Sequence, residues 1–308
     1  MANSPIVTSL PAWVDQQREP LIADVLLAAR TASLFTLQSG IKSKAAINYI
    51  EPDVQFQAGA CGWNEKGTVE LTQREIETGI IKVNMAFCDL NLIGKWAEYQ
   101  VRLAAGHEVL PFEEKFMQAI NDQVKALFET ALWQGDTSSE DGNLAQFDGM
   151  IKILKNESET ITGSASVSAD DLSTYITAAQ KAALAIPSII LKYSDVVLFC
   201  SPSFLRAFGL AMVNANLFHF EPGVDYNDFV IPGTSIKLVA VGGLEGTDYL
   251  VGGRLSNFYY GCDLQNDLET YKLWYSDDNQ EFRLKIQWNA GVQVAFPNEA
   301  LLFTATSA

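Results

Sequence analysis

The chain has 308 residues, of which 48% are apolar and 19% are charged. A chain of this length and composition can bury a sizeable core, as one large domain or two smaller ones, so the composition excludes a largely disordered protein. The 37 acidic residues outnumber the 21 basic ones and give a net charge of −16. Such a surface does not bind nucleic acid over most of its area, because lysine and arginine supply the affinity for phosphate.

No apolar run approaches the roughly 20 residues of a membrane span. The first 20 residues lack the basic and apolar regions of a secretory signal, so we expect a soluble protein made in a cytoplasm, without a membrane partner. The four cysteines, Cys61, Cys88, Cys200 and Cys262, are scattered singly. This spacing fits neither a disulfide framework nor a paired-cysteine metal site, so we expect small buried side chains.

The first predicted element is a helix over 20–38, opened by Pro20 and ending before Gly40. A β-rich excursion follows. Apolar and polar residues alternate within 54–60, 69–72 and 81–88, and strands of eight to ten residues extend about 26–34 Å. Because the neighbouring sequence offers few partner strands, we interpret this excursion as an arm rather than as part of a compact core.

The clearest predicted helix spans 111–134. Apolar residues recur there at steps of three and four, Pro111 suits the first turn and Gly135 suits the end. Another helix is expected from Ser168, where Asp171 gives the spacing of a capping box, to Pro187. Helices and strands are interspersed without a regular β–α–β alternation, so the expected fold class is α+β.

The end of the chain predicts two or three strands between 271 and 299. Residues 276–280 supply a turn, and apolar and polar side chains then alternate. The apolar face contains Phe282, Leu284, Ile286 and Trp288. We expect this face to pack on the long helix and the opposite face to meet solvent or a neighbouring subunit.

Residues for catalysis or metal binding do not form a recognisable pattern. His107 and His219 lie far apart, and no ligand spacing surrounds either of them. Ser201 and Ser203 follow a predicted strand but lack the G-x-S-x-G motif, so a helix cap accounts for Ser201. The acidic loop 136–143 lacks the alternating ligands of a calcium loop. We therefore predict no catalytic, cofactor-binding or metal-binding residue, and no cofactor.

Taken in order, four segments resemble the major capsid protein of tailed phages, of the Hong Kong 97-type fold. They are the β excursion with LTQREIETGIIKVNMAFCDLNL, the helix PFEEKFMQAINDQVKALFETALWQGD, the α/β stretch from Ser168 to Cys262, and the closing hairpin with GVQVAFPNEALLF. The resemblance implies five parts. These are an N-terminal arm and helix (1–46), an extended β loop (47–90), a peripheral domain with a spine helix at about 111–134 (91–167), an axial domain (168–262) and closing strands of the peripheral domain (263–308).

The resemblance also implies a function without catalysis. The chain would self-assemble, as hexamers and pentamers, into the icosahedral head that encloses viral double-stranded DNA, and it would contact that DNA without sequence specificity. The implied location is the virion, with assembly in the host cytoplasm and a portal protein as a partner. Some family members carry a longer N-terminal scaffolding region, so the short segment before the arm implies a separate scaffolding protein.

We place the subunit interface on the arm, because exposed strand edges aggregate unless a neighbour covers them. The expected interface residues are Phe56, Trp63, Asn64, Glu65, Lys66, Val69 and Leu71. Two alternatives remain open. One is an encapsulin-type cargo shell of the same fold. The other is a soluble α+β enzyme that uses carboxylates, which would be a compact monomer with a pocket.

Overall fold

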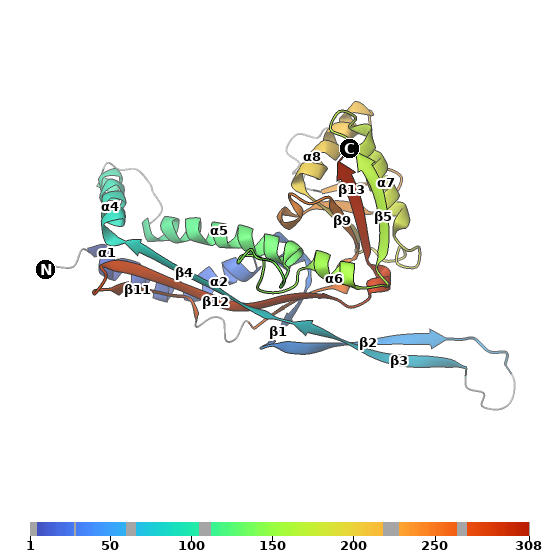
Figure 1. Ribbon diagram of the computed structural model, residues 1–308, viewed down its shortest axis with the longest axis horizontal. Helices are drawn as coiled ribbons and strands as arrows, with labels where there is room; N and C mark the ends of the chain where they lie inside the picture. Colours follow the sequence, from blue (N-terminus) through green and yellow to red (C-terminus); the bar gives the residue numbers. More distant parts are fainter. Residues whose placement is uncertain are drawn as a thin grey trace.

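The computed structural model describes residues 5–27, 29–59, 66–104, 112–217, 228–263 and 270–307. The first β-sheet runs alongside a long helix, the second sheet lies beyond the C-terminal end of that helix, and a two-stranded arm projects from the first sheet (Figure 1). None of the described helices is long and apolar enough to cross a membrane.

The first sheet is built around one long strand, β12 (Glu281–Val294). Strands β10 and β11 pair with one edge of β12, and β4 pairs with the other edge over ten residues. Strand β1 pairs with β10 in parallel. The remaining strands of this sheet are β1 (Thr36–Ser39), β4 (Gly79–Cys88), β10 (Phe258–Cys262) and β11 (Lys272–Ser276).

Helices cover one face of the first sheet. As expected from their alternation, Phe282, Leu284, Ile286 and Trp288 are buried, and the rings of Trp288 and Phe128 of the long helix lie 5.7 Å apart. The N-terminal helices contribute to the same hydrophobic core. The covering helices are α1 (Pro5–Gln16), α2 (Arg18–Leu27), α3 (Arg30–Leu34) and the long helix α5 (Phe112–Gln134).

The second sheet has six strands in the order β5-β13-β9-β6-β8-β7. Helices α7 (Ser173–Ala185) and α8 (Pro202–Asn214) pack on it, and the core between them is rich in alanine. Helices α4 (Asp89–Ala104) and α6 (Met150–Asn156) flank the long helix in sequence. The strands are β5 (Ile161–Val167), β6 (Val196–Cys200), β7 (Asp228–Val230), β8 (Lys237–Ala240), β9 (Tyr249–Arg254) and β13 (Leu301–Ser307).

The prediction of one helix over 20–38 is wrong. The described residues before residue 35 form three helices, and Thr36–Ser39 is strand β1. The reason is tertiary: Phe35 ends α3 and packs against Phe258 at 5.4 Å and Trp133 at 5.7 Å between ring centroids. The next residues then pair with β10, which outweighs their local helical pattern.

The predicted capping box at Ser168 and Asp171 does not form. Helix α7 begins at Ser173. The backbone N–H of Ser168 donates to Thr174 Oγ1 at 2.9 Å, and Asp171 Oδ1 accepts from the N–H of Ser173 at 3.1 Å. Side-chain turns before the helix therefore replace the box. The other predicted cap is confirmed, because Ser201 Oγ accepts from the N–H of Phe204 at 3.1 Å at the start of α8.

The expected closing hairpin is also corrected. Strand β12 pairs with β11 as predicted, but β13 leaves the first sheet and pairs with β5 and β9 in the second. The short helical turn η4 (Pro297–Glu299) carries the chain between the sheets, and Arg254 contacts Glu299 at 3.4 Å. The last strand and 161–167 therefore belong to the same sheet as most of 168–262.

The cysteines are partly as predicted. Cys200 and Cys262 are free and buried, and burial raises the pKa of the Cys200 thiol. Cys88 is exposed at the end of β4, contrary to expectation. Cys88 lies on the outward-facing side of this edge strand, opposite Glu281. The sequence does not show which side of the strand faces outward. Cys61 lies outside the described residues.

Candidate assembly surfaces

The arm consists of β2 (Lys44–Val54) and β3 (Gly67–Glu77), paired antiparallel along their whole length. Eleven residues of strand correspond to a length of about 36 Å. In the described part of the chain neither strand joins another sheet, and the pair extends away from both sheets (Figure 1). Strand β4, which we expected in the arm, lies instead in the first sheet, so the arm ends at Glu77.

The base of the arm is anchored to the first sheet. Ile47 and Ile76 are buried with Ile41 and Ala295 in a small hydrophobic cluster. Gln293 Nε2 donates to the carbonyl of Glu75 at 2.8 Å. These contacts hold the first pairs of the hairpin, so the position of the arm is set by its base.

The outer part of the arm exposes apolar side chains. Phe56 is 100% exposed, Val54 75% and Val69 65%. Lys66 is exposed as well, and Leu71 lies in β3. Of the expected interface residues, Trp63, Asn64 and Glu65 lie outside the described residues. The structure thus places Phe56, Lys66 and Val69 on one projecting element and leaves their interface role a prediction.

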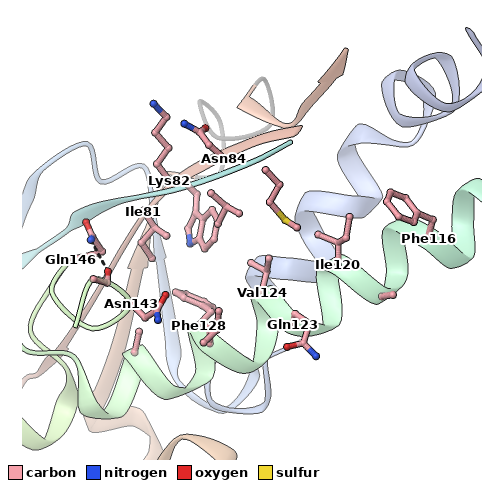
Figure 2. Close-up of a pocket in the computed structure, with 17 residues that line it drawn as sticks. Ile81, Lys82, Asn84, Phe116, Ile120, Gln123, Val124, Phe128, Asn143 and Gln146 are labelled. Atoms are coloured by element: carbon pink, nitrogen blue, oxygen red, sulfur yellow. Dashed lines mark hydrogen bonds between the residues drawn. The ribbon is translucent and has the colours of Figure 1, made fainter. Parts of the chain in front are cut away.

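An open apolar groove of about 710 Å³ runs between β4 and α5. Figure 2 shows Ile81 pointing from β4 toward the helix, where Phe116, Ile120 and Phe128 face the strand. Among the described residues that line the groove, Lys82 is the only charged one. A groove without a carboxylate does not match the carboxylate enzyme that the sequence left open as an alternative.

A buried carboxylate, Glu129, joins the long helix to the N-terminal helices. Its Oε2 accepts from the backbone N–H of Thr31 at 3.1 Å, and its Oε1 accepts from the Thr31 hydroxyl. The indole Nε1 of Trp133 donates to the same hydroxyl at 2.6 Å. At the C-terminal end of the same helix, Gln134 Nε2 donates to the carbonyl of Gly243 at 2.7 Å. The long helix, α3 and a turn at the second sheet therefore meet at this joint.

Burial raises the pKa of Glu129 above its ordinary value, although both Thr31 hydrogen bonds favour the charged form. The folded state therefore binds the proton more tightly than the unfolded state, and ionisation costs stability as the pH rises through the folded pKa. The glutamine amide of Glu129→Gln mimics the protonated carboxyl. We expect the Tm of Glu129→Gln relative to the wild type to increase from pH 4 to pH 8. A constant or decreasing difference in thermal melts would contradict this assignment.

In the acidic loop after the long helix, a lysine side chain forms ion pairs with two of the carboxylates. Lys152 Nζ lies 2.7 Å from Asp136 Oδ1 and 2.7 Å from Asp148 Oδ1. Hydrogen bonds from Lys152 and Ser138 hold the pKa of Asp136 well below its usual range. Within the described ranges no group of three or more potential metal ligands occurs. Both histidines, His107 and His219, lie outside these ranges.

Comparisons with known proteins decide the fold. No family model and no curated protein sequence matches the chain. Solved structures do match. A chain of the satellite phage P4 procapsid, which includes the size determination (Sid) protein, shares 14% identity at a TM-score of 0.63 over 94% of this chain and 91% of that one.

Two further structures agree. A chain of the capsid of cyanophage P-SCSP1u shares 11% identity at a TM-score of 0.51, covering 89% of this chain and 87% of that one. A chain of Mycobacterium phage Ogopogo shares 13% identity at a TM-score of 0.56, covering 91% of this chain and 92% of that one. The chain has a phage-capsid fold. The α+β class and the capsid resemblance predicted from the sequence are thereby confirmed at the level of fold.

Proposed function

We propose that this chain is the major capsid protein of a tailed phage, a structural subunit that self-assembles into an icosahedral shell around double-stranded DNA. The observation that carries this proposal is the arm, whose exposed side chains include the fully exposed Phe56. Within the described residues, neither strand of the arm pairs with a strand outside it, in a fold similar to that of chains from a procapsid and a capsid.

The physical argument concerns the strand edges. An isolated two-stranded hairpin is marginally stable in water, and its free edges and apolar side chains invite aggregation. In a closed shell, a neighbouring copy covers each arm, and the same heterologous contact repeats around the symmetry axes. The exposed strand edges and apolar side chains of the arm are therefore covered only when copies of the chain assemble.

The parts of the chain take roles accordingly. The arm is the extended loop, α5 the spine helix, the first sheet the core of the peripheral domain and the second sheet the core of the axial domain. The location is the virion, after assembly in the host cytoplasm. Partners are further copies in hexamers and pentamers, scaffolding and portal proteins, and packaged DNA. No catalytic step is part of the proposal.

The test is the size of the purified chain as its concentration rises, alone and with a candidate scaffolding protein from the same genome. Sedimentation velocity should show capsomers or larger particles, and negative-stain electron microscopy should show sheets or closed shells. An enzyme of the alternative class would remain a compact monomer. A monodisperse monomer under every condition would refute the proposal.

A further inference from the structure

On the face of the first sheet that lies opposite the helices, the described part of the chain places no covering element. The side chains of this face come from alternate residues of β4, β11 and β12, and their strand registers place them on one face. Figure 2 shows Lys82 and Asn84 pointing away from the long helix, on this side of β4. A shallow hollow of about 390 Å³ lies here. We call this surface the basic face, after Lys82, Lys272, Arg283 and Lys285.

Three lysines on the basic face have no partner of opposite charge among the residues that the structure describes. Lys272 lies directly opposite Lys285 in the β11–β12 pair, and Lys285 lies opposite Asn84 in the β12–β4 pair. Like charges directly opposite each other destabilise a sheet. In the described part of the chain none of these lysines forms an ion pair, whereas Arg283 is paired with Glu281 at 2.9 Å. Among the described residues, these lysines thus form a positive cluster without an acidic partner.

An exposed aromatic residue lies within this cluster. Trp274 is 41% exposed and lies directly opposite Arg283. Together with Lys82 and Lys285, both residues line the hollow. Tryptophan and arginine are the side chains that most often anchor protein–protein contacts. The basic face therefore combines positive charge with an aromatic anchor on a surface that the described part of the chain leaves exposed.

We propose that the basic face binds an acidic surface of a second copy of this chain. This inference rests on the proposed self-assembly. The chain has 37 acidic residues and a net charge of −16, so two copies repel each other and each copy offers many carboxylates. A positive surface that meets carboxylates of the second copy offsets this repulsion, and the basic face supplies one. Desolvated contacts between lysine and carboxylate groups fix register and suppress wrong partners.

Nucleic acid is the less favoured occupant. A polyanion approaches this chain against a net charge of −16, and its affinity depends on the number of phosphates that free cations neutralise. Only three of the four basic side chains are free of an acidic partner within the described residues. The experiment therefore includes DNA as a separate ligand.

The experiment compares the wild type with Lys272→Gln/Lys285→Gln. The control is Lys42→Gln/Lys115→Gln, which removes two exposed lysines outside the basic face and changes the net charge equally. We expect the monomer Tm of the first variant to equal or exceed the wild-type Tm, because a like-charge pair is removed. We expect its critical concentration for assembly, measured by light scattering, to be at least tenfold higher than the critical concentration of the control.

Two outcomes would overturn this inference and leave the proposed function intact. The first is that the wild type assembles and both double variants assemble equally well. The second is that the basic-face variant assembles normally but loses binding of a labelled DNA duplex, measured by fluorescence anisotropy, which would make the face a nucleic-acid site. If the wild type never assembles, the proposed function fails and the inference fails with it. Lys82→Gln/Lys272→Gln serves as a second variant if the first does not fold.

Discussion

Shortening the arm should abolish assembly while leaving a folded monomer. The variant replaces residues 49–72 with an Asn-Gly turn, which suits a two-residue hairpin. It retains the pair Asn48–Gln73 and the buried base residues Ile47 and Ile76. Because the described residues of the removed segment project away from both sheets, we expect a Tm close to that of the wild type, and no particles by electron microscopy.

The deletion must stop before β4. A cut that continued to Val83 would remove half of the strand that pairs with β12 and would unfold the sheet for an unrelated reason. The matched control is Phe56→Ser, which retains the length of the arm and removes a fully exposed ring. We expect weaker assembly at unchanged Tm. If the shortened chain unfolds, the outer arm belongs to the core; if it assembles normally, the arm is not the interface.

Replacing Trp133 should remove a large part of the stability of the chain. Its side chain is 0% exposed and packs against Phe35 at 5.7 Å and Phe199 of the second sheet at 5.2 Å. Its indole also donates to Thr31. Large-to-small changes of buried aromatic residues cost about 3–5 kcal/mol. We therefore expect Trp133→Ala to lower the free energy of unfolding by that amount in urea titrations.

Two control variants separate the effect of burying the tryptophan side chain from the effect of its hydrogen bond to Thr31. Trp133→Phe retains most of the volume and leaves the Thr31 hydroxyl without its indole donor, so it should lose less stability than Trp133→Ala. Trp274→Ala truncates a tryptophan that is 41% exposed and should change the free energy of unfolding by about 0.5 kcal/mol or less. Equal losses for Trp133→Ala and Trp274→Ala would mean that the buried aromatic cluster does not join the two sheets.

Elements with strong local patterns could be predicted from the sequence. The long helix was expected at 111–134 and is observed as Phe112–Gln134, because its apolar period and its terminal residues agree. The alternation of β12 and the cap at Ser201 are equally local. These signals depend on residues within one or two turns of each other, so no knowledge of the rest of the fold is needed.

Elements that depend on distant partners were missed. Strand β1 exists because β10, more than 200 residues later, pairs with it. The last strand belongs to the second sheet because β5 and β9 lie there. The sequence also misassigned β4 to the arm, since its alternation is the same whether it pairs with β12 or projects freely. A strand's period gives its two faces but not its neighbours.

The candidate surfaces also differ in whether the sequence alone could predict them. The exposed arm residues Phe56, Lys66 and Val69 were expected from the lack of nearby partner strands. The basic face was not, although Lys272 and Lys285 both occupy polar positions of alternating strands. Only the register between β11 and β12 shows that they lie opposite each other. The joint at Glu129 had no sequence signal, because an acidic residue on a helix is ordinarily solvated.

Cryo-electron microscopy of particles assembled from this chain tests the central claim most directly. We predict a curved or closed lattice in which the arm Lys44–Glu77 of each copy lies across a neighbouring copy and buries Phe56 against it. A lattice in which the arm folds back onto its own chain, or a chain that stays monomeric at every concentration with and without scaffolding protein, would contradict the account.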